Sequence, residues 1–463
     1  MKYVSTRGEA PELGFEDVLL TGLARDGGLY VPDQWPTLTP DDLRGLRGAS
    51  YQDVAYAVTS KFMGDAVPEA ELREMIAGAY ATFGHPAVTP LKQMDANQWL
   101  LELFHGPTLA FKDVAMQLLA RLMDWSLKKR KGYVTIVGAT SGDTGGAAID
   151  AFKSSRHATT VILHPHGKVS NVQRRQMTTV DEPSIHNIAI EGNFDDCQAI
   201  VKALFNDAAF RDRVKLAGVN SINWARIMAQ IVYYVYAAVA LGSPDRKVSF
   251  SVPTGNFGDI FAGLVAKRMG VPIDRLIIAT NVNDILDRAL RTGHYEMLGV
   301  QPSTSPSMDI QISSNFERLL YLAYGRDVSA LRSLMAGLSQ SGSFTIGQKE
   351  LAAIRAEFDS AAVGEAKTAQ TIAQTLARTG ELLDPHSAIG FATALQAKAS
   401  DSAMITLATA HPAKFPDAVE KASGIRPNLP PRLIHLLNAK ERFTILPNSA
   451  TAVRDFVLAL HKA

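Results

Sequence analysis

Short apolar runs alternate with longer amphipathic stretches over most of the chain beyond about residue 100. The apolar runs are rich in β-branched residues and cover residues 133–137, 160–163, 186–190, 247–252, 276–280 and 403–408. Alternation of this kind is typical of parallel strands joined by crossover helices. The pattern therefore predicts an α/β fold.

The clearest helix signal begins at Asp113. Apolar residues recur after it at helical spacing, at Ala115, Leu118, Leu119 and Leu122. A face with this period must be buried, so we expect a long core helix at this position. A second helix is predicted over residues 260–268, directly after the strand at 247–252 and a glycine-rich turn.

The first 85 residues have a different texture, with closely spaced turn signals and only short helical patterns such as residues 41–46. A chain of 463 residues also exceeds the usual size of one hydrophobic core. We therefore predict a small N-terminal domain over residues 1–85 and a larger α/β unit over residues 86–463.

Charge and composition favour a small-molecule partner. The 47 basic and 46 acidic side chains leave no basic face for nucleic acid. No apolar run approaches the roughly 20 residues that a membrane span needs, and no secretory leader is visible. The single cysteine, Cys197, fits a reducing compartment. We expect a cytoplasmic protein without nucleic-acid or membrane partners.

Two glycine-rich turns follow predicted strands and precede predicted helices. The first contains Ser141, Gly142, Asp143 and Thr144, and the second contains Gly255, Asn256, Phe257, Gly258 and Asp259. Helix-start N–H groups lack intrahelical acceptors, the helix dipole is positive there, and glycine admits an anion close to the backbone. Such turns also serve simply as connections, but two together favour two sites for anionic groups.

Several well-known catalytic motifs do not occur in the sequence. It contains no G-x-G-x-x-G and no P-loop, which counts against a nicotinamide dehydrogenase and an NTPase. The motifs H-E-x-x-H, C-x-x-C and G-x-S-x-G are also missing. His164 and His166 have the spacing of metal ligands but no further Cys or His nearby, so no metal site is predicted.

Lys112 stands among apolar residues just before the long helix. Burial would lower the pKa of its amine, and a neutral amine can attack a carbonyl group and later accept a proton from carbon. The alternative is a side chain that lies along the surface with its charge in water. The local sequence alone leaves both possibilities open.

Ordered motifs along the chain resemble those of threonine synthase, a family of fold-type II pyridoxal 5′-phosphate (PLP) enzymes. They are HGPTLAFKD at 105–113, SGDTG at 141–145, GNFGD at 255–259, SINWAR at 221–226, MDIQISSNFER at 308–318, DPHS at 384–387 and ATAHPAKF at 408–415. Residues 3–8 and 26–32 are similar to the extra N-terminal domain of that family. The resemblance implies a tryptophan synthase β-like fold of two doubly wound α/β lobes with a small N-terminal domain.

The resemblance also implies roles for individual residues. In the family the lysine of the HGPT-x-AFKD motif is bonded to PLP, which makes Lys112 the catalytic and cofactor-binding lysine. The turn of Gly255, Asn256, Phe257, Gly258 and Asp259 would bind the cofactor phosphate. Thr409 would face the pyridine nitrogen, where a neutral hydroxyl makes the ring a gentler electron sink.

Substrate-binding residues are expected in two further segments. The loop of Ser141, Gly142, Asp143 and Thr144 resembles the one that holds the substrate's α-carboxylate. Arginine binds phosphate through a planar fork, so Arg226 with Ser221 and Asn223 is predicted to hold the substrate phosphate. The alternative is that Ser221 and Asn223 cap a helix and Arg226 makes a structural ion pair. Asn171 and Gln173 are weaker candidates for supporting residues.

The implied activity is conversion of O-phospho-L-homoserine and water into L-threonine and phosphate, the last step of threonine biosynthesis, by a monomer or homodimer. Two alternatives remain at this point. One is another fold-type II PLP lyase, such as a threonine dehydratase or an amino-acid phospholyase. The other is a non-catalytic binding protein built on the same scaffold.

Overall fold

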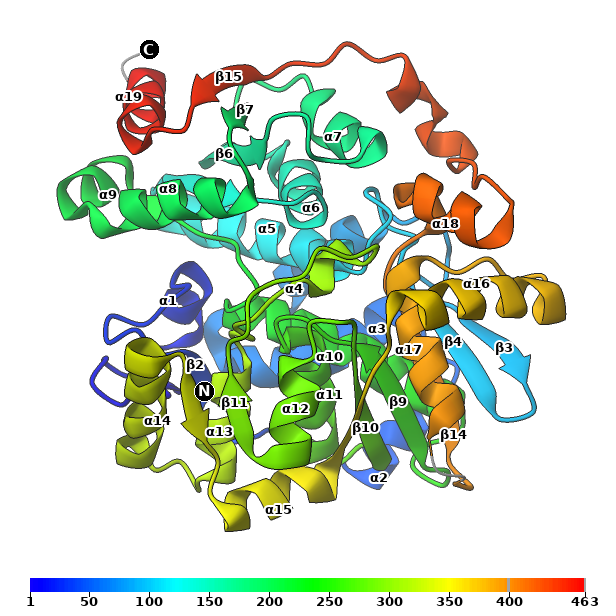
Figure 1. Ribbon diagram of the computed structural model, residues 1–463. Coiled ribbons are helices and arrows are strands. Elements are labelled where there is room, and N and C mark those ends of the chain that lie inside the picture. The colour runs from blue at the N-terminus through cyan, green and yellow to red at the C-terminus, as the bar shows by residue number, and fades with distance from the viewer. Residues whose placement is uncertain (398–399, 462–463) are drawn as a thin grey trace.

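Two α/β lobes, each built on its own sheet, make up most of the protein in the computed structural model (Figure 1), which describes residues 1–397 and 400–461. The chain passes between the lobes more than once, because each sheet contains strands from both halves of the sequence. Wholly buried strands occur in both sheets, at residues 158–165 in one and at residues 248–253 and 403–408 in the other, which explains their continuous apolar composition. The predicted α/β fold with two lobes is confirmed.

The six-stranded lobe contains the sheet with strand order β13-β10-β9-β14-β4-β3, in which only β3 is antiparallel to its neighbour. Its strands are β3 (Leu91–Asp95), β4 (Gln98–Glu102), β9 (Val248–Pro253), β10 (Ile273–Thr280), β13 (Phe358–Ala362) and β14 (Ala403–Ala408). Its helices are α10 (Trp224–Ala240), α11 (Gly258–Arg268), α12 (Ile285–Thr292), α13 (Phe316–Ala323), α14 (Val328–Ser341), α15 (Gln348–Glu357), α16 (Glu365–Thr379), α17 (Pro385–Gln396) and α18 (Pro416–Ser423). A small ribbon of β11 (His294–Glu296) and β12 (Ser343–Thr345) lies beside α12 and α14.

The five-stranded lobe contains a wholly parallel sheet of order β15-β7-β6-β5-β8. Its strands are β5 (Val134–Ala139), β6 (Ala158–Pro165), β7 (Ile185–Glu191), β8 (Leu216–Ala217) and β15 (Thr444–Pro447). Its helices are α5 (Lys112–Lys129), α6 (Asp143–Phe152), α7 (Asn171–Thr178), α8 (Phe194–Asn206), α9 (Ala208–Val214) and α19 (Ala450–Leu460). The C-terminal segment runs from α18 past α7 to reach β15 on the far side of this lobe (Figure 1).

The N-terminal segment packs on the six-stranded lobe and on α5. It consists of β1 (Tyr3–Ser5), α1 (Phe15–Leu20), β2 (Tyr30–Pro32), α2 (Pro40–Gly45), α3 (Tyr51–Met63) and α4 (Glu69–Tyr80). Its apolar side chains share one continuous core with α5 and α10. Arg318 of α13 is fully buried and donates hydrogen bonds to the carbonyls of Tyr30 and Ile222, which joins β2 to the start of α10.

All six predicted strands are present, with ends that differ by a few residues. The two predicted helices begin slightly earlier than the sequence suggested, at Lys112 and at Gly258. The second starts early because Phe257 takes a left-handed conformation with φ 63° and ends the turn directly before the helix. Within residues 1–397 and 400–461, no helix combines the length and apolar character needed to cross a membrane.

Candidate active site

Lys112 begins α5 in the interior between the lobes, and its side chain is buried. Its Nζ lies 3.0 Å from Oδ2 of Asp143 and 3.2 Å from Oγ of Ser307. Asp143 begins α6 after the first glycine-rich turn, and Ser307 lies in the loop between β11 and α13. The exposed position that the local sequence left open for Lys112 is therefore ruled out.

Charge around Lys112 is mainly positive. Burial lowers the pKa of the Lys112 amine, and the charges of Lys414 and Arg226 lower it further, while Asp143 opposes the shift. Burial also acts against ionisation of Asp143, but Lys112 and Lys414 together hold the pKa of this carboxyl well below its usual range. The cluster thus combines one ionised carboxylate with three basic side chains, and it favours anionic ligands.

The first glycine-rich turn is closed by Thr140, whose hydroxyl accepts hydrogen bonds from the N–H groups of Gly142 and Gly145, both at 2.9 Å. The N–H groups of Asp143 and Thr144, at the start of α6, have no intrahelical acceptor. Ser141 and Thr144 are half-buried beside them. The carboxylate of Asp143 is occupied by lysines, so an anion in this turn would meet the backbone rather than this side chain.

The second glycine-rich turn lies close to the loop that carries Ser307. A Cβ atom at Gly255 would lie 2.6 Å from the carbonyl oxygen of Ser307, so only glycine allows this approach. The carbonyl of Gly255 accepts a 2.6 Å hydrogen bond from Ser313 Oγ. Asn315 donates to the carbonyl of Asn256 from its backbone at 3.0 Å and from its side chain at 2.9 Å. These contacts fix the turn and leave the first N–H groups of α11 without intrahelical acceptors.

The side chains of Phe257 and Asp259 stabilise this turn through contacts with neighbouring elements. The strained backbone of Phe257 is held by its buried ring, which packs against Phe316 and Phe358 at centroid distances of 5.4 and 5.7 Å. The carboxyl of Asp259 accepts hydrogen bonds from Tyr233 and Tyr234 of α10, and burial raises its pKa to about 6. The Asp259 side chain is therefore engaged by α10, and only its backbone remains for an anion in the turn.

The segment from Ser221 to Arg226 adjoins the second turn. The side chain of Asn315 contacts the carbonyls of both Ser221 and Asn256, at 3.3 and 2.9 Å. Asn223 caps α10 by accepting from Ala225 N–H at 2.9 Å, and it donates to Leu19 O at 2.9 Å. Both polar groups of Asn223 are thus occupied, as expected for a structural cap.

Arg226 is a buried cation with few partners. It is 2% exposed, and the one hydrogen bond of its side chain within the described residues is from Nη1 to the carbonyl of Val219 at 3.1 Å. Its Nε is buried without an acceptor, and no carboxylate lies within ion-pair distance among residues 1–397 and 400–461. Burial lowers the pKa of the guanidinium to about 10. Among residues 1–397 and 400–461 Arg226 therefore makes no structural ion pair, and its free Nε suits an anionic ligand.

Thr409 directly follows β14, and its backbone is paired with Phe111, the residue before Lys112. Its backbone N–H donates to Ser387 Oγ at 3.1 Å, and its carbonyl accepts from Phe111 N–H at 2.8 Å. Ser387 and His386, in the first turn of α17, are both hydrogen-bonded to Asp384. The N–H of Ser307 donates to Nε2 of His386 at 3.2 Å, so Nδ1 carries the proton and donates to Asp384.

Sequence reasoning missed three residues of this site, Ser307, His386 and Lys414. Ser307 stands in a Pro/Ser-rich stretch that suggests only a loop. His386 and Lys414 belong to DPHS and ATAHPAKF, two of the motifs that resemble the family. The apolar neighbours of Lys414 were the one feature of the sequence that could have indicated a buried lysine there. Gln173, a weaker candidate, does reach the site and donates to Asp143 Oδ1 at 2.9 Å. Asn171 instead accepts from arginines of its own helix.

These residues fit a phosphate-bearing aldehyde cofactor. A buried amine of lowered pKa is available for bonding to the aldehyde carbon, and helix starts flank it on both lobes. The hydroxyl of Thr409 makes no hydrogen bond within residues 1–397 and 400–461, so it is free to meet a ring nitrogen. The buried Nε of Arg226, which has no acceptor, adds positive charge nearby.

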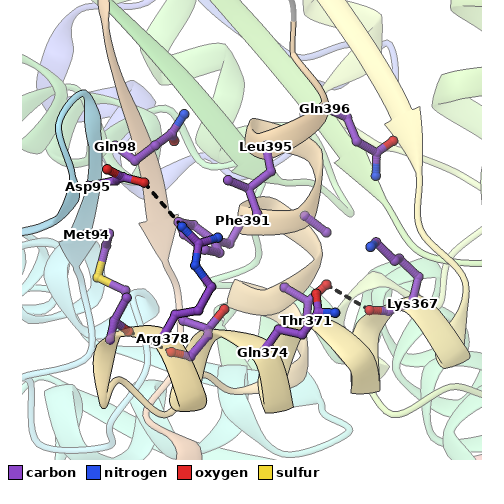
Figure 2. A pocket seen from close by; sticks show the side chains of 13 residues that line it. Met94, Asp95, Gln98, Lys367, Thr371, Gln374, Arg378, Phe391, Leu395 and Gln396 are labelled. Carbon is purple, nitrogen blue, oxygen red and sulfur yellow. Dashed lines mark hydrogen bonds and ion pairs between the residues drawn. The ribbon is translucent and has the colours of Figure 1, made fainter.

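A separate groove of about 220 Å³ lies between α16, α17 and the β3–β4 hairpin (Figure 2). Leu395 and Phe391 of α17 lie between Lys367 on one side and the Asp95–Arg378 ion pair on the other. None of the residues of the site around Lys112 lines this groove. Within the described residues, no group of three or more His, Cys, Asp or Glu side chains is arranged to hold a metal ion.

Three family models match successive parts of the chain: threonine synthase N terminus at residues 2–80, pyridoxal-phosphate dependent enzyme at 83–406, and threonine synthase, C-terminal, at 387–457. The threonine synthase of Pseudomonas aeruginosa is 52% identical over 459 residues, which cover 99% of this chain and 98% of the relative. The PLP-bound threonine synthase structure from Brucella melitensis has a TM-score of 0.98 at 60% identity, with 100% of both chains covered. The Escherichia coli enzyme has a TM-score of 0.83 at 32% identity, covering 99% of this chain and 100% of that one. These matches favour the threonine synthase activity over the other lyases, and the chain belongs to the threonine synthase family of PLP-dependent enzymes.

Proposed function

We propose that the protein converts O-phospho-L-homoserine and water into L-threonine and inorganic phosphate, with Lys112 as its catalytic base. The observation that carries this proposal is the buried Lys112 amine, which lies beside Asp143 and Ser307 between two helix starts. When bound, PLP supplies an electron sink for negative charge that develops at the substrate's Cα and Cβ. The protein supplies binding, orientation and proton transfer.

Lys112 has two tasks in this scheme. It holds the cofactor through its amine before substrate enters, and it moves protons at Cα and Cβ once the substrate has taken its place. A lowered pKa suits both tasks, because each requires the neutral amine at some stage. Asp143 and Ser307 lie at hydrogen-bond distance from Nζ, and they would accept hydrogen bonds from the ammonium form of Lys112 after it has taken up a proton.

Anion binding is divided between the two turns. We assign the cofactor phosphate to the backbone of Gly255, Asn256, Phe257, Gly258 and Asp259, and the pyridine nitrogen to Thr409. The substrate's α-carboxylate is assigned to the backbone of Ser141, Gly142, Asp143 and Thr144, with Ser141 and Thr144 hydroxyls as further donors. Arg226 and Ser221 are assigned to the substrate phosphate, because the Nε of Arg226 is a buried donor without an acceptor. Asn223 would act only as the cap that places Arg226.

One incubation tests the activity directly. Purified protein, PLP and O-phospho-L-homoserine should yield phosphate and threonine in equal amounts, and Lys112→Ala should yield neither. Phosphate accompanied by a keto acid instead of threonine would contradict the proposed product and favour a phospholyase.

The Arg226 assignment has its own experiment. Arg226→Met should raise KM for O-phospho-L-homoserine by one to two orders of magnitude, since a charge-assisted phosphate contact contributes about 1.5–3 kcal/mol. Cofactor affinity, measured by titrating the apoprotein with PLP, should change little. A loss of PLP affinity with unchanged KM would place Arg226 at the cofactor phosphate instead.

Three broader features complete the proposal. We place the end of the N-terminal domain at residue 85, five residues beyond the last helix residue of α4 and the matched N-terminal family segment. A reducing, cytoplasmic location is supported by the single buried cysteine, Cys197. The active form would be a monomer or homodimer, which sedimentation of the holoenzyme can distinguish.

A further inference from the structure

Lys414 is a second lysine in the site, and it is completely buried at 0% exposure. It lies at the end of a short 3₁₀ helix, Pro412–Lys414, after β14. Its Nζ donates to Thr108 O at 2.5 Å and to Gln176 Oε1 at 2.9 Å, and it lies 3.1 Å from Asp143 Oδ1. The three N–H donors of this ammonium are therefore used within the protein.

Asp143 is shared between the two lysines. Its Oδ2 faces Lys112 at 3.0 Å, and its Oδ1 faces Lys414 at 3.1 Å. Gln173 donates to Oδ1 at 2.9 Å and Ser307 donates to Oδ2 at 3.0 Å, so each carboxylate oxygen has two partners. This arrangement fixes the direction from which Asp143 meets the Lys112 amine.

Asp143 and Lys414 have opposite effects on the protonation of the Lys112 amine. A lone buried Lys112–Asp143 pair would favour the ammonium form, which cannot attack an aldehyde. Lys414 shares the negative charge of Asp143 and adds a positive charge near Lys112. Two amines on opposite oxygens of one carboxylate are at most about 8 Å apart, where like charges in a protein shift each other's titration by about one pH unit.

We propose that Lys414 is a positioning residue for Lys112: through Asp143 it fixes the place of the Lys112 amine, and its positive charge favours the neutral form of that amine. This inference rests on the role proposed for Lys112. The other basic groups that face the pair are the guanidinium of Arg226 from α10, which acts on Lys112, and the titratable imidazole of His386 from α17, which faces Asp143. Among the described residues neither is hydrogen-bonded to the side chain of Lys414, whose Nζ contacts Thr108, Gln176 and Asp143.

A purely structural role is the competing explanation, because Lys414 also ties down the loop before Lys112 through Thr108 O. Variants that keep or remove the positive charge of residue 414 distinguish the two explanations. Lys414→Met removes the charge and the hydrogen bonds, Lys414→Gln removes the charge but keeps donors, and Lys414→Arg keeps the charge. Lys421→Met, at an exposed position in α18, is the matched surface control.

The readout is the rate at which apoprotein forms the imine with added PLP, followed by absorbance between pH 6 and pH 10. The proposal predicts that the pH midpoint of this rate rises by about one unit in Lys414→Gln and Lys414→Met. Lys414→Arg and Lys421→Met should keep the wild-type midpoint. If Lys414→Met does not fold, as judged by circular dichroism, Lys414→Gln decides the question.

The opposite results overturn the inference. An unchanged or lowered midpoint in the neutral variants, or an equal rise in Lys414→Arg, would mean that the charge of Lys414 does not act on Lys112. Failure of the role proposed for Lys112 is distinguishable, because wild-type protein would then form no imine at Lys112 at any pH.

Discussion

Replacing Gly255 with alanine tests the close approach between the second turn and the loop of Ser307. A Cβ atom at this position would lie 2.6 Å from Ser307 O and 3.5 Å from the Cα of Met308. Gly255 is not among the residues with positive φ, so backbone strain does not enter. The whole effect of the substitution arises from contact with backbone atoms of a neighbouring segment.

The magnitude follows from the contacts that Ser307 makes. Ordinary Cβ contacts begin near 3.4 Å, so Ser307 O or the turn must move by about 0.8 Å. Ser307 is held by His386 at 3.2 Å and by Asp143 at 3.0 Å, and such a shift would break these hydrogen bonds. Overpacking of this kind costs about 1–3 kcal/mol. Since PLP binding as proposed needs the turn in its present position, we expect this cost to fall on the PLP-bound form and to lower PLP affinity by about 5- to 150-fold.

Gly146 in α6 supplies a matched control. It is a buried glycine in the helix of the first turn, but the nearest atoms to an added Cβ are 3.9 Å away. Gly146→Ala should bind PLP as wild type does and should be more stable by about 0.5–1 kcal/mol, since alanine favours a helix interior.

Titration of the two apoproteins with PLP, followed by fluorescence, measures both effects, with thermal unfolding as the stability check. If Gly255→Ala bound PLP as tightly as wild type and Gly146→Ala did, the turn would not contact the cofactor phosphate in the way described here.

Three further predictions concern stability and pH. Arg318→Met should lower the free energy of unfolding by about 3 kcal/mol, because it leaves the carbonyls of Tyr30 and Ile222 without their buried donor; a melting temperature equal to wild type would contradict this. Burial raises the pKa of Asp113 to about 7, so the stability that its protonated form contributes is complete below about pH 4 and is lost as pH rises to 7; Asp113→Asn should reduce the fall in melting temperature between pH 5 and pH 8. Asn223→Ala should destabilise the protein by about 1–2 kcal/mol in denaturant titrations while PLP affinity is kept, and a selective loss of substrate binding would instead make Asn223 a ligand.

Patterns of local physical origin were predictable from the sequence. The strands were evident because buried parallel strands are continuous apolar runs, and the helix after Asp113 was evident from its period. The two glycine-rich turns were found because anion sites at helix starts need glycine and a preceding strand. Lys112 was predicted to be the PLP-bonded lysine mainly from the resemblance, since its flanking sequence alone fits either a buried or an exposed side chain.

Partners that come from distant segments were not predictable. Ser307, His386 and Lys414 reach the site only because the segment after β11, the start of α17 and the 3₁₀ helix after β14 converge on it. The sequence also did not show in which direction a side chain of a turn points. Asp143 was expected to serve the substrate, but its carboxylate is held by two lysines, and the carboxyl of Asp259 is turned toward Tyr233 and Tyr234.

Identification of the lysine that bonds to PLP is the most direct test of the role proposed for Lys112. The holoenzyme is reduced with borohydride, digested, and its peptides are sequenced by mass spectrometry. We expect a phosphopyridoxyl group on Lys112 and on no other lysine. A modified Lys414 with an unmodified Lys112 would contradict this role.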